Sequence, residues 1–256
     1  MNGVTLKNGK QIPLLGLGTW KLNGQNAAGA VQTALDLGYR HIDTAAMYGN
    51  EREVGNAISC SLVDREHIFI TSKVWPNNFH KKDFIRSVEK SLRSLSSEYL
   101  DLVLLHWKNE AISLHEPLDA LGELIAQGKI LAGGVSNFDE DDLHDALNYA
   151  PEVISVNQIK MAYPFHPGEV INSARQHSVI TTAYSPLNAG SLRSDAVVLH
   201  LAEKYARTPA QITLRWLTQQ DIVAIPKSAS FERLNENLSS LDFSLSDSDI
   251  SDLGII

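Results

Sequence analysis

The sequence is poor in cysteine, with Cys60 alone among 256 residues. One thiol cannot form an intramolecular disulfide, and no spacing of cysteine and histidine is typical of a zinc site. We therefore expect neither a disulfide framework nor a metal. A chain without disulfides fits a reducing compartment, so we expect a cytoplasmic protein.

Long apolar runs and a basic excess are also missing. No segment reaches the roughly 20 apolar residues that span a bilayer, and the first residues lack the pattern of a signal peptide. Lys and Arg number 22 against 30 Asp and Glu, which gives a net charge of −8. Such a chain has no general attraction to nucleic acid or anionic membranes, so an anionic ligand needs a local cationic cluster. We therefore expect a monomer that binds neither nucleic acid nor a membrane.

The sequence does contain a regular alternation of short Val, Ile and Leu runs with amphipathic segments. The runs predicted to be strands are 14–18, 41–43, 68–71, 100–105, 130–135, 153–156, 179–183 and 222–225. The segments predicted to be helices are 25–37, 51–59, 82–95, 116–127, 139–148, 168–177, 195–205, 209–220 and 231–238. Alternating apolar strands and helices indicate a parallel sheet covered by helices.

The size of these units favours a closed barrel. Eight strands in 256 residues leave about 32 residues for each strand and its helix, and no Pro-, Gly- or Ser-rich linker divides the chain. Asn8-Gly9 predicts a hairpin ahead of the first barrel strand. Gly16 and Gly18 lack the third glycine of a dinucleotide-binding loop, so we expect a tight strand exit there. The predicted fold class is α/β, a (β/α)8 TIM barrel in a single domain over residues 1–256.

Polar residues occur where the predicted strands end, which is where barrels carry their reacting groups. They are Asp43, Lys73, His106, Ser136, Asn137, Gln158, Tyr184, Ser185, Lys227 and Ser228. Each one alone is more often a cap, a solvated side chain or a hydrogen-bonded core residue than a functional group. Their convergence on the C-terminal end of one barrel, its mouth, favours a site.

Tyr48 lies five residues beyond Asp43, close enough to turn back over this mouth. A free tyrosine has a pKa near 10, and an adjacent ammonium such as Lys73 would lower that pKa. Asp43 would keep Lys73 charged, and His106 would complete a pair of donors around one oxygen. A carbonyl that becomes an alkoxide needs this arrangement, so these residues predict proton donation to a carbonyl.

The segment 38–51, GYRHIDTAAMYGNE, resembles the signature of the aldo-keto reductases. Segments 70–75, 104–107, 134–138, 156–158, 183–187 and 225–228 also match, so the resemblance runs from the hairpin to about Leu245. The chain looks most like the short prokaryotic-type reductases that act on 2,5-diketogluconate or methylglyoxal. The resemblance implies a barrel closed at its bottom by the N-terminal β-hairpin.

The resemblance implies a catalytic tetrad at the mouth and a nicotinamide coenzyme beside it. The tetrad would be Asp43, Tyr48, Lys73 and His106, with Tyr48 as the proton donor. The residues implied for the nicotinamide half are Ser136, Asn137 and Gln158 on the carboxamide, Tyr184 stacked on the ring, and Ser185, Pro186 and Leu187 along the pyrophosphate. Asn188-Ala189-Gly190 replaces the family's glycine-rich continuation.

A cationic cluster near the C-terminus bears on which coenzyme is used. Arg233 and Asn237 are four residues apart, hence on one face of a short helix whose N-terminus points toward Lys227. Two cations, the Ser228 hydroxyl and a helix start suit a phosphate. In the family this spacing binds the adenosine 2′-phosphate, with Glu236 and Asn237 on the adenine. We therefore expect NADPH rather than NADH.

Trp20, Met47, Trp75 and Trp107 are expected to wall an apolar substrate pocket, whereas Trp216 lies at helical spacing typical of core packing. The expected substrates are small aldehydes and ketones, including α-dicarbonyls, keto acids and keto sugars. Three departures from the family pattern are Lys108, Lys160 and the segment 162–164. The two lysines either bring positive charge to the mouth, favouring acidic or polyhydroxylated substrates, or lie on the surface.

Two other functions fit the same residues less well. One is a barrel that binds NADPH in a regulatory or structural role, against which the intact tetrad argues. The other is a sugar isomerase that binds a phosphate on the same barrel and needs no nicotinamide. Binding of NADPH and its oxidation by a generic aldehyde distinguish the three.

Overall fold

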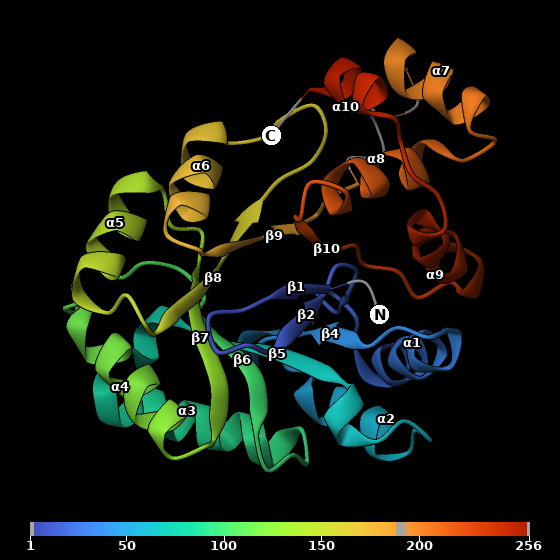
Figure 1. The fold of residues 1–256 in the computed structure, drawn as a ribbon. Coiled ribbons are helices and arrows are strands. Elements are labelled where there is room, and N and C mark those ends of the chain that lie inside the picture. The colour runs from blue at the N-terminus through green and yellow to red at the C-terminus, as the bar shows by residue number, and fades with distance from the viewer. Residues whose placement is uncertain (1–2, 188–191, 193, 255–256) are drawn as a thin grey trace.

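The computed structural model describes residues 3–187, 192 and 194–254 and shows a barrel of parallel strands surrounded by helices (Figure 1). The eight barrel strands pair in chain order from β3 to β10. They are β3 Leu17–Gly18, β4 His41–Asp43, β5 Phe69–Val74, β6 Leu100–Leu105, β7 Ile130–Ser136, β8 Ile154–Lys160, β9 Ile180–Tyr184 and β10 Val223–Ile225. The predicted (β/α)8 fold class is confirmed.

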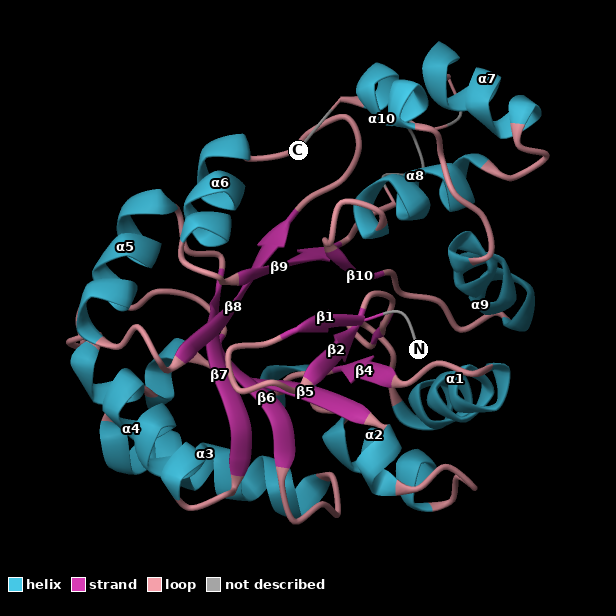
Figure 2. Cartoon of the chain, in the orientation of Figure 1, coloured by secondary structure: helices cyan, strands magenta, loops and turns pink. Residues whose placement is uncertain are grey.

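An antiparallel hairpin of β1 Gly3–Thr5 and β2 Gln11–Pro13 fills one end of the barrel. Leu6 and Ile12 are buried and pack with barrel-interior side chains such as Leu104 and Val156. In Figure 2 the hairpin lies inside the outline of the strand ring. Apolar side chains therefore occupy the lower barrel, as the resemblance implied, and polar chemistry is left to the opposite end.

Helices follow the strands and bury their apolar faces against the outside of the sheet. They are α1 Gly24–Leu37, α2 Glu51–Ser59, α3 Lys81–Ser94, α4 His115–Ala126, α5 Glu140–Tyr149, α6 Gly168–Gln176, α7 Ala196–Lys204, α8 Pro209–Thr218, α9 Phe231–Leu238 and α10 Asp247–Leu253. The expected boundaries of α1 to α9 differ from these by at most two residues. None of the described helices is long and apolar enough to cross a membrane.

Helix α10 was not expected, because its seven residues are mostly polar. Ser246 caps its first turn, and the buried carboxylate of Asp249 anchors it to α7. That carboxylate accepts hydrogen bonds from Lys204 Nζ at 2.7 Å, from the Tyr205 hydroxyl and from Ser246. Polar contacts, rather than a periodic apolar face, hold this helix in place.

The barrel closes where the first strand meets the last. The Gly16 amide donates to the Ala224 carbonyl at 2.9 Å, and the Gly18 amide donates to Pro226 at 3.2 Å. A Cβ on Gly18 would lie 2.7 Å from the Ile225 carbonyl oxygen. The sharp turn itself comes later, at Lys21 with φ of 62°. Gly18 ends β3, as expected of a strand exit, and it also allows the close approach of β10, whereas a Cβ on Gly16 would meet the His41 ring at 2.6 Å.

Gly18→Ala should destabilise this closure, because the added methyl meets backbone that cannot rotate away. We expect a loss of about 1–3 kcal/mol, seen as a fall of about 2–4 °C in Tm per kcal/mol. Gly29→Ala is the matched control, since nothing lies within 4 Å of its Cβ in the middle of α1. Equal melting temperatures for the two variants would contradict the closure argument.

Candidate active site

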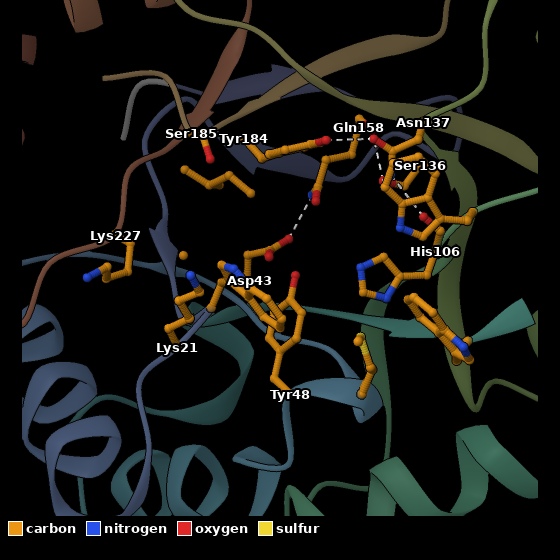
Figure 3. A pocket seen from close by; sticks show the side chains of 16 residues that line it. Lys21, Asp43, Tyr48, His106, Ser136, Asn137, Gln158, Tyr184, Ser185 and Lys227 are labelled. Carbon is orange, nitrogen blue, oxygen red and sulfur yellow. Dashed lines mark hydrogen bonds between the residues drawn. The ribbon is translucent and has the colours of Figure 1, made fainter. Parts of the chain in front are cut away.

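A cavity of about 440 Å³ opens at the C-terminal ends of the barrel strands (Figure 3). Most of the residues singled out from the sequence line it together. Its predicted lining residues are Asp43, Tyr48, His106, Ser136, Asn137, Gln158, Tyr184, Ser185 and Lys227, with Trp20, Met47, Trp75 and Trp107. The convergence expected at the mouth is therefore present.

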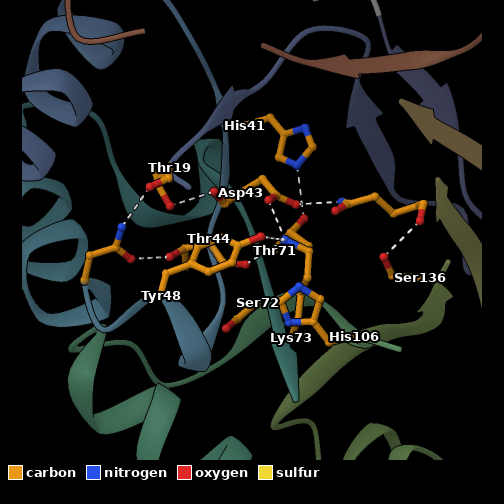
Figure 4. Close-up of polar contacts among 12 residues, drawn as sticks. Thr19, His41, Asp43, Thr44, Tyr48, Thr71, Ser72, Lys73, His106 and Ser136 are labelled. Carbon is orange, nitrogen blue, oxygen red and sulfur yellow. Dashed lines mark hydrogen bonds and ion pairs between the residues drawn. The ribbon is translucent and has the colours of Figure 1, made fainter. Parts of the chain in front are cut away.

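Lys73 lies beneath this cavity as a buried ammonium with three oxygen partners (Figure 4). Its Nζ is 2.5 Å from Asp43 Oδ1, 2.9 Å from the Thr44 carbonyl oxygen and 3.4 Å from the Tyr48 hydroxyl. Burial acts to lower the pKa of Lys73, but the charge of Asp43 and the contact with Tyr48 outweigh it, and the pKa is raised. Lys73 therefore stays charged next to the Tyr48 hydroxyl.

The pKa of Tyr48 differs from the sequence-based expectation. Burial raises this pKa, and the nearby Lys73 ammonium, which lowers it, does not overcome the effect of burial. The expectation of a net lowering was wrong, because desolvation of the buried phenol outweighs the charge of Lys73. In the cavity as it stands, Tyr48 is a protonated phenol held by a cation.

His106 faces the same region as a neutral imidazole. Burial, reinforced by the charge of Lys73, lowers the pKa of His106 to about 3. The ring centroid lies 5.6 Å from that of Tyr48 and 5.2 Å from that of Trp75, edge to face in both pairs. A neutral imidazole carries one N–H, so His106 can donate one hydrogen bond without adding a charge.

The residues expected to bind the nicotinamide carboxamide form one hydrogen-bonded network. Gln158 Nε2 donates to Asp43 Oδ2 at 2.8 Å, and the Ser136 hydroxyl donates to the Gln158 carbonyl at 2.9 Å. Asn137 Nδ2 donates to Ser136, and its oxygen accepts from the Tyr184 hydroxyl at 2.8 Å. The network links β4, β7, β8 and β9 and fixes these side chains relative to the buried ion pair.

Three non-glycine residues that line the cavity adopt left-handed backbone conformations. They are Lys21, Asn137 and Ser185, with φ of 62°, 61° and 52°. Each follows a barrel strand, where the chain must turn sharply. Strain of this kind concentrates at binding and catalytic sites, where the surrounding structure compensates for it.

A second cavity of about 370 Å³ adjoins the first through Lys227, which lines both. Its predicted lining residues are Leu187, Lys227, Ser228, Arg233, Glu236 and Asn237. Ser230 caps α9 by accepting from the Arg233 amide, and Arg233, in the first turn of α9, lines this cavity. Pro186 is buried and lines neither cavity, and Asn188-Ala189-Gly190 lies outside the described residues.

Several lining residues were not predicted from the sequence. Lys21 adds a cation to the first cavity, and it could have been found because it directly follows Trp20 at a strand exit. Thr208, Pro209 and Ala210, at the start of α8, line the second cavity. No local pattern indicates that the start of α8 lies beside α9, where Gln211 donates to the Glu236 carbonyl, so these residues could be found only from the fold.

The aromatic side chains expected to wall the pocket do so, and Trp216 is fully buried in the core as expected. The Trp20 and Tyr48 rings lie 4.8 Å apart, and Trp20 and Trp107 are each 45% exposed at the rim. Lys108 pairs with Asp142 on α5 and Lys160 is exposed, and neither lines this cavity. Of the two alternatives for these lysines, the structure supports surface residues.

No group of three or more potential ligand side chains in the described residues could hold a metal ion.

Asp43→Asn should strongly destabilise the chain, because it leaves Lys73 charged and buried without its anionic partner. We expect the free energy of unfolding, measured by urea denaturation, to fall by about 3–5 kcal/mol. The double variant Asp43→Asn/Lys73→Met should recover part of that loss, whereas equal stability of Asp43→Asn and wild type would contradict the role of the ion pair.

The sequence matches the aldo/keto reductase family over residues 14–256. An aldo-keto reductase of Mycolicibacterium smegmatis is 38% identical over 252 residues, covering 98% of this chain and 91% of the relative. The aldose reductase of Schistosoma japonicum superimposes with a TM-score of 0.93 at 32% identity, covering 99% and 91% of the two chains. A candidate 2,5-diketo-D-gluconic acid reductase B superimposes with a TM-score of 0.94 at 36% identity, covering 99% of this chain and 91% of that chain.

Proposed function

The chain belongs to the aldo/keto reductase family, whose members act on carbonyl groups with nicotinamide cofactors, and we propose that it reduces small aldehydes and ketones with NADPH. The observation that carries the proposal is the chain of contacts from Asp43 through Lys73 to the Tyr48 hydroxyl, at the floor of an aromatic-walled cavity. A regulatory barrel would have no need of a buried ammonium aimed at a phenol.

Tyr48 is the proposed proton donor. As hydride reaches the carbonyl carbon, the carbonyl oxygen becomes an alkoxide that is far more basic than a phenolate, so a protonated phenol can transfer its proton. Lys73 stabilises the phenolate that forms, and Asp43 keeps Lys73 charged and in place. His106 donates its N–H to the same oxygen. These two donors would orient the carbonyl and stabilise its developing charge.

The two adjoining cavities fit an elongated coenzyme with a cationic end. When bound, the coenzyme supplies the hydride. Ser136, Asn137 and Gln158 would hold the carboxamide, and Tyr184 would stack on the ring. The strand-end residues Ser185, Pro186 and Leu187 are proposed to border the pyrophosphate.

NADPH is preferred in this proposal because the second cavity carries two cations in a chain whose net charge is −8. Lys227, Ser228 and Arg233 would bind the adenosine phosphate, with Glu236 and Asn237 on the adenine. Neither Lys227 nor Arg233 forms an ion pair with another described residue, so both charges are available to a ligand. NADH lacks the phosphate that these groups would neutralise.

The substrate side is open. Trp20, Met47 and Trp107 are about half exposed, so the rim restricts a substrate only loosely. Small α-dicarbonyls, keto acids and keto sugars would fit such a site. Similarity to a candidate 2,5-diketo-D-gluconic acid reductase B supports the keto-sugar acids within this class.

Tyr48→Phe should lower kcat for the reduction of nitrobenzaldehyde by about 10²–10⁴-fold, because the proton donor is removed. NADPH affinity, measured by fluorescence titration, should stay near that of wild type. Tyr149→Phe, on the surface of α5, is the matched control and should leave both quantities unchanged. Near-wild-type turnover by Tyr48→Phe would refute the assignment of the acid, and NADPH binding without turnover by wild type would favour the regulatory alternative.

Arg233→Ala should remove a charge-assisted bond of about 1.5–3 kcal/mol, or roughly one to two decades of NADPH affinity. NADH affinity should change little, because NADH has no 2′-phosphate. Arg52→Ala, an exposed arginine on α2, serves as the control. Equal losses for both coenzymes would be inconsistent with a phosphate-specific role.

A further inference from the structure

A third cavity, of about 490 Å³, lies beside the mouth and has no part in the proposed chemistry. Met47 and Trp75 line both this cavity and the substrate cavity, so the two hollows adjoin at these side chains. On its far side the lining comes from α3. A ligand that extends from the catalytic centre across Met47 and Trp75 therefore reaches α3.

The face of α3 that lines this cavity is cationic. Arg86, Lys90 and Arg93 are spaced by four and three residues, which puts them on one side of the helix. The one carboxylate in the lining is Asp83, which pairs with Arg86 at 3.0 Å. Among the described residues neither Lys90 nor Arg93 forms an ion pair, so this groove keeps a local positive charge.

The positive charge of the groove is not required by the packing beneath it. Lys90 acts electrostatically on the buried carboxyl of Glu51, but that carboxyl accepts a hydrogen bond from the Ser72 hydroxyl at 2.7 Å and makes no ion pair with Lys90. Lys90 and Arg93 are exposed. Three cations facing one hollow are unusual in a chain with a net charge of −8.

We propose that this α3 groove binds the anionic end group, such as a carboxylate, of elongated carbonyl substrates whose reacting carbonyl lies at Tyr48. The proposal rests on the proposed function and narrows its substrate class. Met47 and Trp75 would contact the apolar chain between the two ends, and Arg86, Lys90 and Arg93 would bind the anion. The groove thus selects substrates by charge at a distance from the reacting carbon.

The test compares 9-oxononanoate with nonanal, which share a chain length and an aldehyde but differ in the terminal charge. Wild type should reduce 9-oxononanoate with a kcat/KM about tenfold higher at low salt, and the preference should shrink as salt screens the groove. The single variants Lys90→Glu and Arg93→Glu should each abolish the preference for 9-oxononanoate by raising its KM. The kcat for 9-oxononanoate and the kinetics of nonanal reduction should stay unchanged.

Lys82→Glu is the matched control, because it makes the same charge change on α3 outside the cavity lining. The groove assignment is overturned if Lys90→Glu keeps the preference, or if Lys82→Glu removes as much of it. Nonanoate affinity, measured by calorimetry, tests the groove independently of the proposed function, because it requires no reduction. Nonanoate binding that Lys90→Glu weakens and Lys82→Glu does not supports the groove even if neither aldehyde is reduced, in which case the proposed function alone fails.

Discussion

The buried ion pair between Lys73 and Asp43 is the interaction on which the rest of the site depends. An ammonium without water is stable only next to an anion and further hydrogen-bond acceptors, and β4 supplies these through Asp43 and Thr44. The pair in turn orients the Tyr48 hydroxyl, and through Gln158 it holds the network on the opposite strands. A single pair thus connects Tyr48, the proposed proton donor, to the proposed coenzyme side of the cavity.

Such a pair is possible because the barrel separates apolar from polar material along its axis. The hairpin residues Leu6 and Ile12 fill the lower barrel with apolar side chains, which leaves the upper end for charged groups. Charge is also divided around the rim. The chain is acidic overall, while cations gather at Lys227 and Arg233 on one side of the mouth and on α3 on another.

The barrel fold and most of the cavity residues could be predicted from the sequence. Parallel barrel strands are continuous apolar runs, and the polar residues that directly follow them converge at one end of the barrel. Asp43, Tyr48 and His106 needed no more than strand order and spacing. Three features depended on tertiary contacts: the burial that raises the pKa of Tyr48, the polar anchoring of α10 by Asp249, and the close strand approach at Gly18. The cationic face of α3 was not singled out from the sequence, because only the fold sets it beside Trp75.

The seam between β3 and β10 joins the two ends of the barrel chain. Gly18 comes from the first barrel strand, Ile225 ends the last and Lys227 follows it, and all three line the cavity that contains Tyr48. During synthesis on the ribosome, the proposed proton donor Tyr48 and its neighbours Lys73 and His106 emerge long before the strand that completes their cavity. A nascent chain lacking its final strand would hold the chemical groups without the enclosure, so carbonyl reduction would begin only once the seam had closed.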